Sequence, residues 1–202
     1  MNLTLLLVIA IPVAVIGGSV LLAIVASRFA SRARARRAEN FTALAGRLGA
    51  TVTNVMFPAM NGNVRGRGFR LETSSVRRLR FSHAKITMPA ATPIRLELYA
   101  QTSKIAASML SDIETGDRKF DDAAIVRSDR GGAVPAILDS GIRARLLELA
   151  SREFQWRLVV HEREALLEWQ GDFASAEMSQ RAGAWVEVVA LVAEACEREA
   201  SS

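Results

Sequence analysis

The longest apolar run of the chain is its first segment. Residues 3–26 carry no formal charge and consist mainly of Leu, Val, Ile and Ala. As a helix, this run would span roughly 36 Å, which is enough to cross a hydrocarbon core of about 30 Å with some tilt. The pattern therefore predicts a transmembrane anchor over residues 1–27.

The charges beside the apolar run decide its expected orientation. Five arginines follow the run and no Lys or Arg precedes it, and arginine resists translocation. We therefore expect a single-pass inner-membrane protein with its N-terminus outside and its C-terminal domain in the cytoplasm. A cleavable signal peptide is the main alternative, because Val25-Ala26-Ser27 looks like a cleavage site. The missing basic n-region and an apolar run longer than about 7–15 residues favour the uncleaved anchor.

The arginines form an expected juxtamembrane collar over residues 28–37. Topology is its main expected role, and anionic lipid headgroups are a second expected partner, because each positive charge near such a surface contributes about 1 kcal/mol. Small residues spaced four apart within the apolar run let two helices approach, so a homodimer through this stripe stays open. The collar is Arg28, Arg32, Arg34, Arg36 and Arg37, and the stripe is Ala10, Ala14 and Gly18.

From residue 38 onward the chain has the pattern of a domain, 38–202. The clearest strand covers residues 92–100, where the even positions from Ile94 are apolar and the odd positions from Arg95 are polar or aromatic. This alternation is typical of an antiparallel sheet with one buried and one wet face. The run Asn61-Gly62-Asn63 predicts a turn. Further strands are expected at residues 51–57, 64–73, 81–88 and 123–127.

Helices are expected on both sides of this run of strands. Residues 39–49 have a helical period, and Asp139 is a suitable N-cap for a second helix. The final helix covers residues 175–198, and its acidic C-terminal residues oppose the helix dipole, so we expect its last turn to fray. Its apolar stripe consists of Met178, Ala182, Trp185, Val189, Val192 and Cys196.

The order of elements predicts the fold class. Residues 154–170 alternate on both sides of a turn near residues 161–163 and predict a hairpin between the last two helices. Runs of strands, rather than strict alternation of strand and helix, favour the α+β class. We therefore predict an N-terminal transmembrane helix followed by a mainly antiparallel sheet with helices packed on one face.

The distribution of charge limits the kinds of partner that we expect, and the cysteine content limits the covalent links within the chain. The formal charge of +5 is local, because five of the 26 basic residues belong to the collar and the rest balance the 21 acids. Residues 64–85 carry seven basic residues and only one acid, Glu72. A solvated sheet face is the simplest interpretation of this segment and a lipid-facing edge stays open, whereas nucleic acid is not expected, because no binding motif is present. A single cysteine, Cys196, excludes an intrachain disulfide.

No set of residues matches a catalytic, metal or cofactor signature. The only histidines are His83 and His161, and no Gly-x-Ser-x-Gly elbow would seat a nucleophilic serine. One cysteine and two separated histidines cannot supply a zinc set. The glycines of residues 62–68 have no helix after them, so they do not form a phosphate loop. We expect no catalytic residue, no metal and no cofactor.

The acidic loop Asp112–Asp122 is the strongest candidate for chemistry. Its spacing does not fit a calcium loop, because Asp117 stands where the loop needs glycine and Gly116 comes one place early. A solvated loop whose aspartates cap local turns is the simpler interpretation. The alternative is a cell-envelope or lipid-directed enzyme that uses these carboxylates.

The same loop carries a resemblance. The run Gly116-Asp117, then Phe120-Asp121, then two apolar residues resembles a Gly-Asp…Phe-Asp motif of uncharacterised bacterial proteins with one N-terminal membrane helix and an α+β domain. Ala124 departs from the motif, where a bulkier residue is expected. The resemblance implies an organisation and no activity. From the residues themselves, we expect Phe120 to fix the loop in the core while the two aspartates accept hydrogen bonds from turn amides.

The expected function follows from placement rather than from a site. We predict a membrane-tethered, non-enzymatic module that offers a surface to lipid or to a protein partner of unknown identity.

Overall fold

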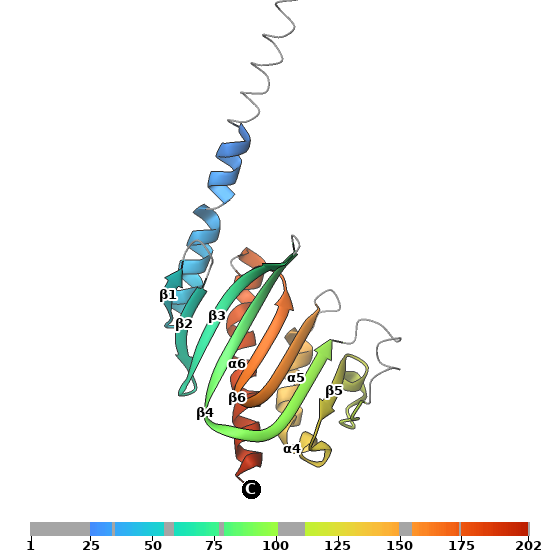
Figure 1. Cartoon of the computed structure of the whole chain (residues 1–202). Helices are drawn as coiled ribbons and strands as arrows, with labels where there is room; N and C mark the ends of the chain where they lie inside the picture. Colours follow the sequence, from blue (N-terminus) through green and yellow to red (C-terminus); the bar gives the residue numbers. More distant parts are fainter. Residues whose placement is uncertain are drawn as a thin grey trace, which may run out of the picture. The chain divides into compact units, whose positions relative to one another are not determined.

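The computed structural model describes residues 25–33, 35–54, 59–76, 79–100, 112–149, 155–173 and 175–201. The chain divides into two compact units, Met1–Glu39 and Asn40–Ser202. The described residues of the first unit are helical. The second unit starts within a helix that ends at residue 47. It also contains the sheet, the other helices and the core (Figure 1).

The transmembrane helix is the main correction to the expected fold. Residues 1–24, and with them most of the apolar run, lie outside the described residues. No helix among the described residues is long and apolar enough to span a membrane. Of the expected anchor, only residues 25–27 belong to the described part of the chain. The transmembrane helix, and the single-pass inner-membrane location that depends on it, is therefore wrong for the part of the chain that the structure describes.

The α+β class and the mainly antiparallel sheet are confirmed. A six-stranded sheet has the order β1-β2-β3-β4-β5, with β6 paired to β4. All of its pairings are antiparallel. The strands expected separately at 81–88 and 92–100 are joined in one long strand. The strands are β1 (Thr51–Asn54), β2 (Ala59–Val64), β3 (Arg67–Val76), β4 (Leu79–Ala100), β5 (Ala124–Ser128) and β6 (Trp156–Gln170).

β4 and β6 are both bent, and β6 lies inside the bend of β4 (Figure 1). The first half of β4 pairs with the second half of β6, and the second half of β4 pairs with the first half of β6. The N–H of Gln170 donates to the carbonyl of Gln155 at 3.0 Å, so the two ends of β6 lie side by side. The chain reverses at Glu162, which has a φ of 52°. The predicted hairpin, with its turn near 161–163, is confirmed.

The first expected turn is wrong by a few residues. Asn61-Gly62-Asn63 lies inside β2, and the chain reverses instead at Arg65 and Gly66, which have φ values of 52° and 75°. Gly62 pairs with Phe69, and a Cβ at Gly62 would lie 2.5 Å from a carbon of the Phe69 ring. The glycine is therefore required by the packing of an aromatic ring over the strand and not by a turn.

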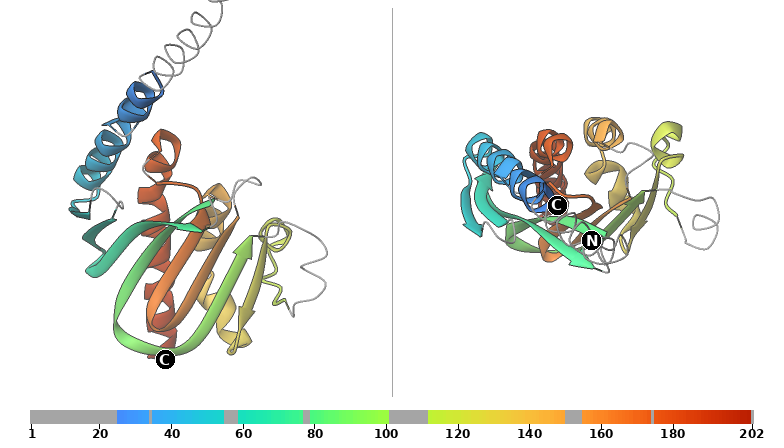
Figure 2. Two further views of the ribbon diagram at one scale, coloured as in Figure 1. Left: turned by 45° about the horizontal axis from the view of Figure 1, so that its top comes forward. Right: turned by 90° about the horizontal axis from the view of Figure 1, so that it is seen from above.

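The helices of the second unit lie on one face of the sheet (Figure 2). The predicted N-cap at Asp139 is confirmed, because its Oδ1 accepts from the N–H of Ile142 at 2.8 Å. Ser175, which was expected only to begin the last helix, is also an N-cap, and its Oγ accepts from the N–H of Met178. Every member of the predicted stripe of the last helix is buried. Besides the short 3-10 helix Gly131–Ala133, the helices are α3 (Arg118–Asp121), α4 (Val134–Ile137), α5 (Ser140–Leu149) and α6 (Ala176–Ala200).

α6 keeps a regular last turn to Ala200, and two of its acidic residues are paired with the β2–β3 turn. Arg65 Nε donates to Glu194 Oε2 at 2.9 Å, and Arg67 forms an ion pair with Glu197. The hydrogen bond from Arg65 lowers the pKa of Glu194 below its ordinary value. These ion pairs oppose the unfavourable helix dipole and fix the turn to the helix. Two arginines of the basic segment 64–85, Arg65 and Arg67, therefore form ion pairs within the second unit.

Candidate functional site

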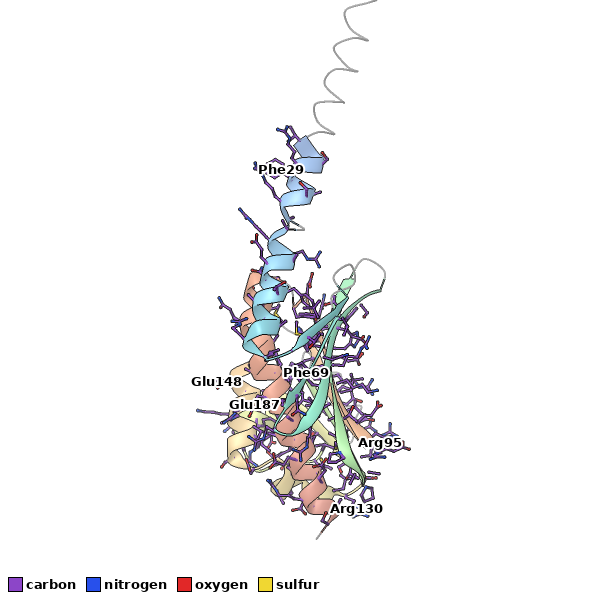
Figure 3. The ribbon with its side chains drawn as sticks, turned by 90° about the vertical axis from the view of Figure 1, so that its left-hand side faces the viewer. Phe29, Phe69, Arg95, Arg130, Glu148 and Glu187 are labelled. Atoms are coloured by element: carbon purple, nitrogen blue, oxygen red, sulfur yellow. The ribbon has the colours of Figure 1, made fainter. Side chains whose placement is uncertain are left out.

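The face of the sheet that the helices leave uncovered carries the polar side chains of the strands. Figure 3 shows Arg95 of β4 on this side and Glu148 and Glu187 of the helices on the other. Within β4, Ile94, Leu96 and Leu98 are at most 1 % exposed and point to the core. The open face is the wet face that the alternation of polar and apolar residues predicts.

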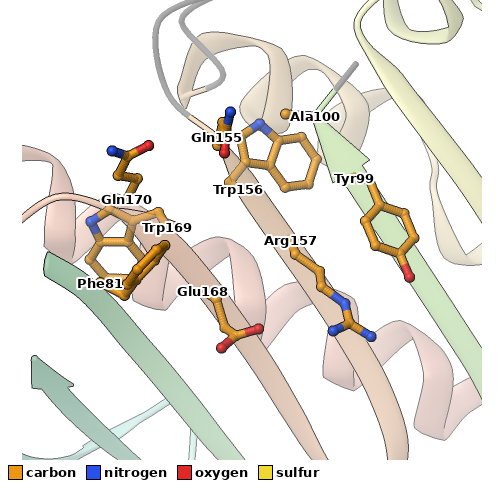
Figure 4. Close-up of a pocket in the computed structure, with 9 residues that line it drawn as sticks. All are labelled: Phe81, Tyr99, Ala100, Gln155, Trp156, Arg157, Glu168, Trp169 and Gln170. Carbon is orange, nitrogen blue, oxygen red and sulfur yellow. The ribbon is translucent and has the colours of Figure 1, made fainter. Parts of the chain in front are cut away.

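Two hollows lie on this side of the molecule, and the first is largely aromatic. It has a volume of about 330 Å³ and lies where β4 and β6 end (Figure 4). Trp156 and Trp169 border it, but their rings are 4 % and 1 % exposed and pack against Trp185 of α6 on the helix side of the sheet, so the aromatic side chains on the open side are Phe81 and Tyr99. Beside them the lining includes Phe81, Tyr99, Ala100, Gln155, Arg157, Glu168 and Gln170.

The second hollow is polar and has a volume of about 520 Å³. It shares Arg157 with the first hollow, so the two adjoin along the open face. Its charged lining has three guanidinium groups and two carboxylates, which leaves one excess positive charge. The lining residues are Arg95, Glu97, Ile113, Arg127, Ser128, Asp129 and Arg157.

Glu97 is the most buried carboxylate of this hollow, with 7 % of its surface exposed. Tyr99 donates its hydroxyl to Glu97 Oε2, and Arg95 donates to Oε1 from Nε at 3.0 Å and from Nη2 at 2.7 Å. The hydrogen bond from Tyr99, and then the bonds from Arg95, hold the pKa of Glu97 below its ordinary value, although burial opposes them. Burial, followed by the bond to Glu97, raises the pKa of Tyr99. Glu97 is therefore held in its ionised form and Tyr99 in its protonated form at neutral pH.

The three arginines of the polar hollow differ in the groups that their side chains contact. Arg95 is paired with Glu97, and its backbone N–H donates to Asp129 Oδ1 at 2.9 Å. The guanidinium of Arg157 lies 5.4 Å from the centre of the Tyr99 ring, within the range of a cation–π contact. For Arg127, no hydrogen bond or ion pair is found within the described part of the chain. Arg127 is thus the side chain best able to take a negative charge from outside.

A second arrangement on the same face joins three strands. His83 Nε2 lies 2.7 Å from Ser74 Oγ, and His83 Nδ1 lies 3.2 Å from Glu168 Oε1. This is the order of groups of a nucleophile, a base and an orienting acid. Sequence reasoning placed His83 in a strand but missed this set, because the three residues are far apart in the chain and meet only through the register of β3, β4 and β6.

The acidic loop has a different geometry. Asp117 caps α3 by accepting from the N–H groups of Lys119 and Phe120, and Asp121 Oδ1 accepts from the N–H of Thr115 at 3.0 Å and from its hydroxyl at 2.7 Å. Asp112 Oδ1 accepts from the N–H of Val126 at 2.8 Å. Gly116 takes a φ of 80°, and Phe120 is 1 % exposed.

These contacts give the loop a structural role. Three of its aspartates hold the turn before α3 and the start of β5, and Phe120 enters the core. Arg143 Nε, from α5, lies 3.5 Å from Asp117 Oδ2 and ties the loop to the helix layer. Among the described residues, no group of three or more His, Cys, Asp or Glu could hold a metal ion.

The remaining predicted sites fall mostly in the first unit. Arg28, Arg32 and Arg36 are exposed on its helical residues, and Arg37 is half-buried. Arg34 and the small-residue stripe Ala10, Ala14 and Gly18 lie outside the described residues. Their roles at a lipid surface or in a homodimer stay predictions.

Comparisons with known proteins assign no family to the chain. No family model matches the chain, and no curated protein matches it. Among solved structures, it is similar to the crystal structure of the mycobacterial trehalose monomycolate transport factor A, TtfA, with 11 % identity and a TM-score of 0.49. The likeness covers 79 % of this chain and 93 % of that chain. The resemblance to uncharacterised proteins with a Gly-Asp…Phe-Asp motif also stays a prediction.

Proposed function

We propose that this chain is a non-enzymatic binding module whose ligand site is the open face of the sheet between β4 and β6. The observation that carries the proposal is the pair of adjoining hollows, one aromatic and one rich in arginine, on the face that the helices leave uncovered. Ligand sites combine apolar and aromatic surface with a few polar groups that fix orientation, and this face offers both.

The electrostatics of the face support binding over chemistry. The pKa of Glu97 is lowered and that of Tyr99 is raised, so neither group is prepared to move a proton near neutral pH. The lone thiol, Cys196, is fully buried, and burial raises its pKa to about 12, so it is not a nucleophile. Three aspartates of the acidic loop, Asp112, Asp117 and Asp121, accept from backbone amides, which weakens the enzyme alternative based on them.

A direct test uses 1-anilinonaphthalene-8-sulfonate, a fluorescent aromatic sulfonate, with the full chain. We expect saturable binding that is strongly reduced by Phe81→Ser, because Phe81 lines the aromatic hollow. The matched control is Phe29→Ser, since Phe29 is 65 % exposed on a helix of the first unit. Equal losses in both variants would show that the dye adheres to exposed phenyl rings, and the proposal would fail.

One observation favours a second candidate function, acyl hydrolysis by Ser74, His83 and Glu168. Such a site also needs donors aimed at the developing oxyanion, and Ser74 lies within a strand whose backbone pairs with β4 from Phe69 to Val76. We therefore place this candidate second. A fluorophosphonate probe decides between them: an active serine displaces fluoride and forms an Oγ–P bond. Labelling at Ser74 in the full chain, abolished by His83→Gln, would favour the hydrolase; an unlabelled Ser74 removes it.

A further inference from the structure

We propose that the open face binds an amphiphilic anion, an organic molecule that carries one phosphate, sulfonate or carboxylate group next to an apolar portion. This inference rests on the proposed function and names the ligand class of the same site. The two hollows adjoin at Arg157, so one molecule can place its charge in the polar hollow and its apolar portion in the aromatic one.

The charge balance of the polar hollow selects an anion. Glu97 neutralises Arg95, and Asp129 is held by the backbone of Arg95. Arg127 pairs with Glu97 in the strand register but forms no ion pair with it among the described residues. An anionic group between Arg127 and Arg157 would supply the missing charge. Guanidinium groups suit such oxygens, because their N–H donors form a planar fork.

The aromatic hollow selects an apolar portion. Phe81 and Tyr99 offer aromatic surface to this hollow, whereas the rings of Trp156 and Trp169 pack against Trp185 of α6 beneath the sheet. A bare inorganic anion would leave this hollow empty, and a neutral lipid would leave Arg127 without a counter-charge.

The tryptophans provide the readout. All three tryptophans of the chain lie together: Trp169 is stacked on Trp185 at 6.2 Å between ring centres, and Trp156 lies 6.1 Å from Trp185. Binding in the aromatic hollow should therefore change the intrinsic fluorescence of the full chain. The probes are hexyl, octyl and decyl phosphate below their micelle concentrations, with inorganic phosphate and octyl glucoside as the charge-only and tail-only arms.

The expected result has three parts. Affinity should rise about fourfold for each CH₂ that enters the hollow, as burial of apolar surface predicts. Octyl phosphate should bind more tightly than either inorganic phosphate or octyl glucoside. Arg127→Gln should weaken octyl phosphate by about 10- to 100-fold through loss of a charged hydrogen bond. The matched control, Arg145→Gln, changes an exposed arginine of α5 and should leave the affinity unchanged.

Each contrary result has a definite meaning. Equal binding of phosphate and octyl phosphate would show an anion site without an apolar portion. Equal binding of octyl glucoside and octyl phosphate would remove the role of charge. Equal losses for Arg127→Gln and Arg145→Gln would show general electrostatic attraction. Any of these, or no binding of alkyl phosphates to folded protein, overturns the inference. The proposed function would survive if octyl glucoside bound as tightly as octyl phosphate and its binding depended on Phe81, because a neutral ligand on the open face agrees with the proposed function and not with this inference.

Discussion

Two regions of the second unit, the acidic loop and the open face of the sheet, show how differently carboxylates can be used. In the loop of residues 112–122, three aspartates accept hydrogen bonds from amides of the loop or of neighbouring β5. On the open face, Glu97 accepts from two side chains, Arg95 and Tyr99, at the wall of a hollow. The first region uses its acids to shape the backbone, and the second uses one acid to position groups that face solvent.

The comparison shows that a high density of acidic residues in the sequence does not mean that a ligand can reach them. The loop has the denser acids in sequence, yet the contacts of its aspartates end within the fold. The open face has only scattered charges in sequence, yet its strands align them beside aromatic rings. A ligand can reach the second arrangement, because the helices cover only the other face of the sheet (Figure 2). The comparison predicts that changes in the loop alter stability and that changes on the face alter binding.

The largest effect should come from the aromatic residue that anchors the loop. Phe120 is 1 % exposed, so Phe120→Ala should lower the free energy of unfolding by about 3–5 kcal/mol, as for other buried phenyl rings. Phe81→Ala is the matched change on the open face and should cost clearly less, because Phe81 is half-buried. Denaturant unfolding of both variants measures the difference. Equal costs would contradict the division into a structural loop and an accessible face.

The next effect concerns Glu97 and has a defined pH dependence. Because the folded pKa of Glu97 is lowered, its contribution to stability is fully present above its ordinary pKa of 4.5 and is lost as the pH falls through the lowered value. Glu97→Gln should reduce the free energy of unfolding by about 1–3 kcal/mol at neutral pH, and the gap to the native protein should shrink in acid.

The control for this change is Glu164→Gln. Glu164 forms an ion pair with Lys85, but its side chain is 54 % exposed, so the cost should stay below about 1 kcal/mol. Urea unfolding at several pH values compares the three proteins. A gap for Glu97→Gln that does not narrow toward acid pH would mean that its charge does not stabilise the fold.

The fold was largely predictable because its signals are local. Alternation marked the buried face of β4, the cap at Asp139 marked the start of one helix, and an apolar stripe marked the last helix. Apart from the transmembrane helix, the errors arose where a residue elsewhere in the fold decided the outcome. Gly62 looks like a turn residue until the ring of Phe69 packs against it. The acids at the end of α6 look unfavourable until the β2–β3 turn brings Arg65 to them.

The candidate site was much less predictable for the same physical reason. Its groups come from β4, β5 and β6, and their proximity depends on which strand lies between which others. No spacing in the sequence shows that β6 lies inside the bend of β4, so nothing there brings Tyr99 beside Arg157. The one available signal was the polar side of the alternation at residues 92–100, which marks an exposed face without saying what lies next to it.

The smallest effect tests whether the acidic loop does anything besides capping. Asp117→Ala removes the N-cap of α3 and should cost about 0.5–2 kcal/mol in unfolding free energy. Asp122→Ala is the matched control, since its side chain is 77 % exposed and lies 4.0 Å from Arg118, and it should cost less than about 0.5 kcal/mol. Both variants should bind the naphthalene sulfonate as tightly as the unaltered chain. If Asp117→Ala left stability intact but weakened binding, the carboxylate would face a ligand rather than the backbone, and the contrast between the two regions would be lost.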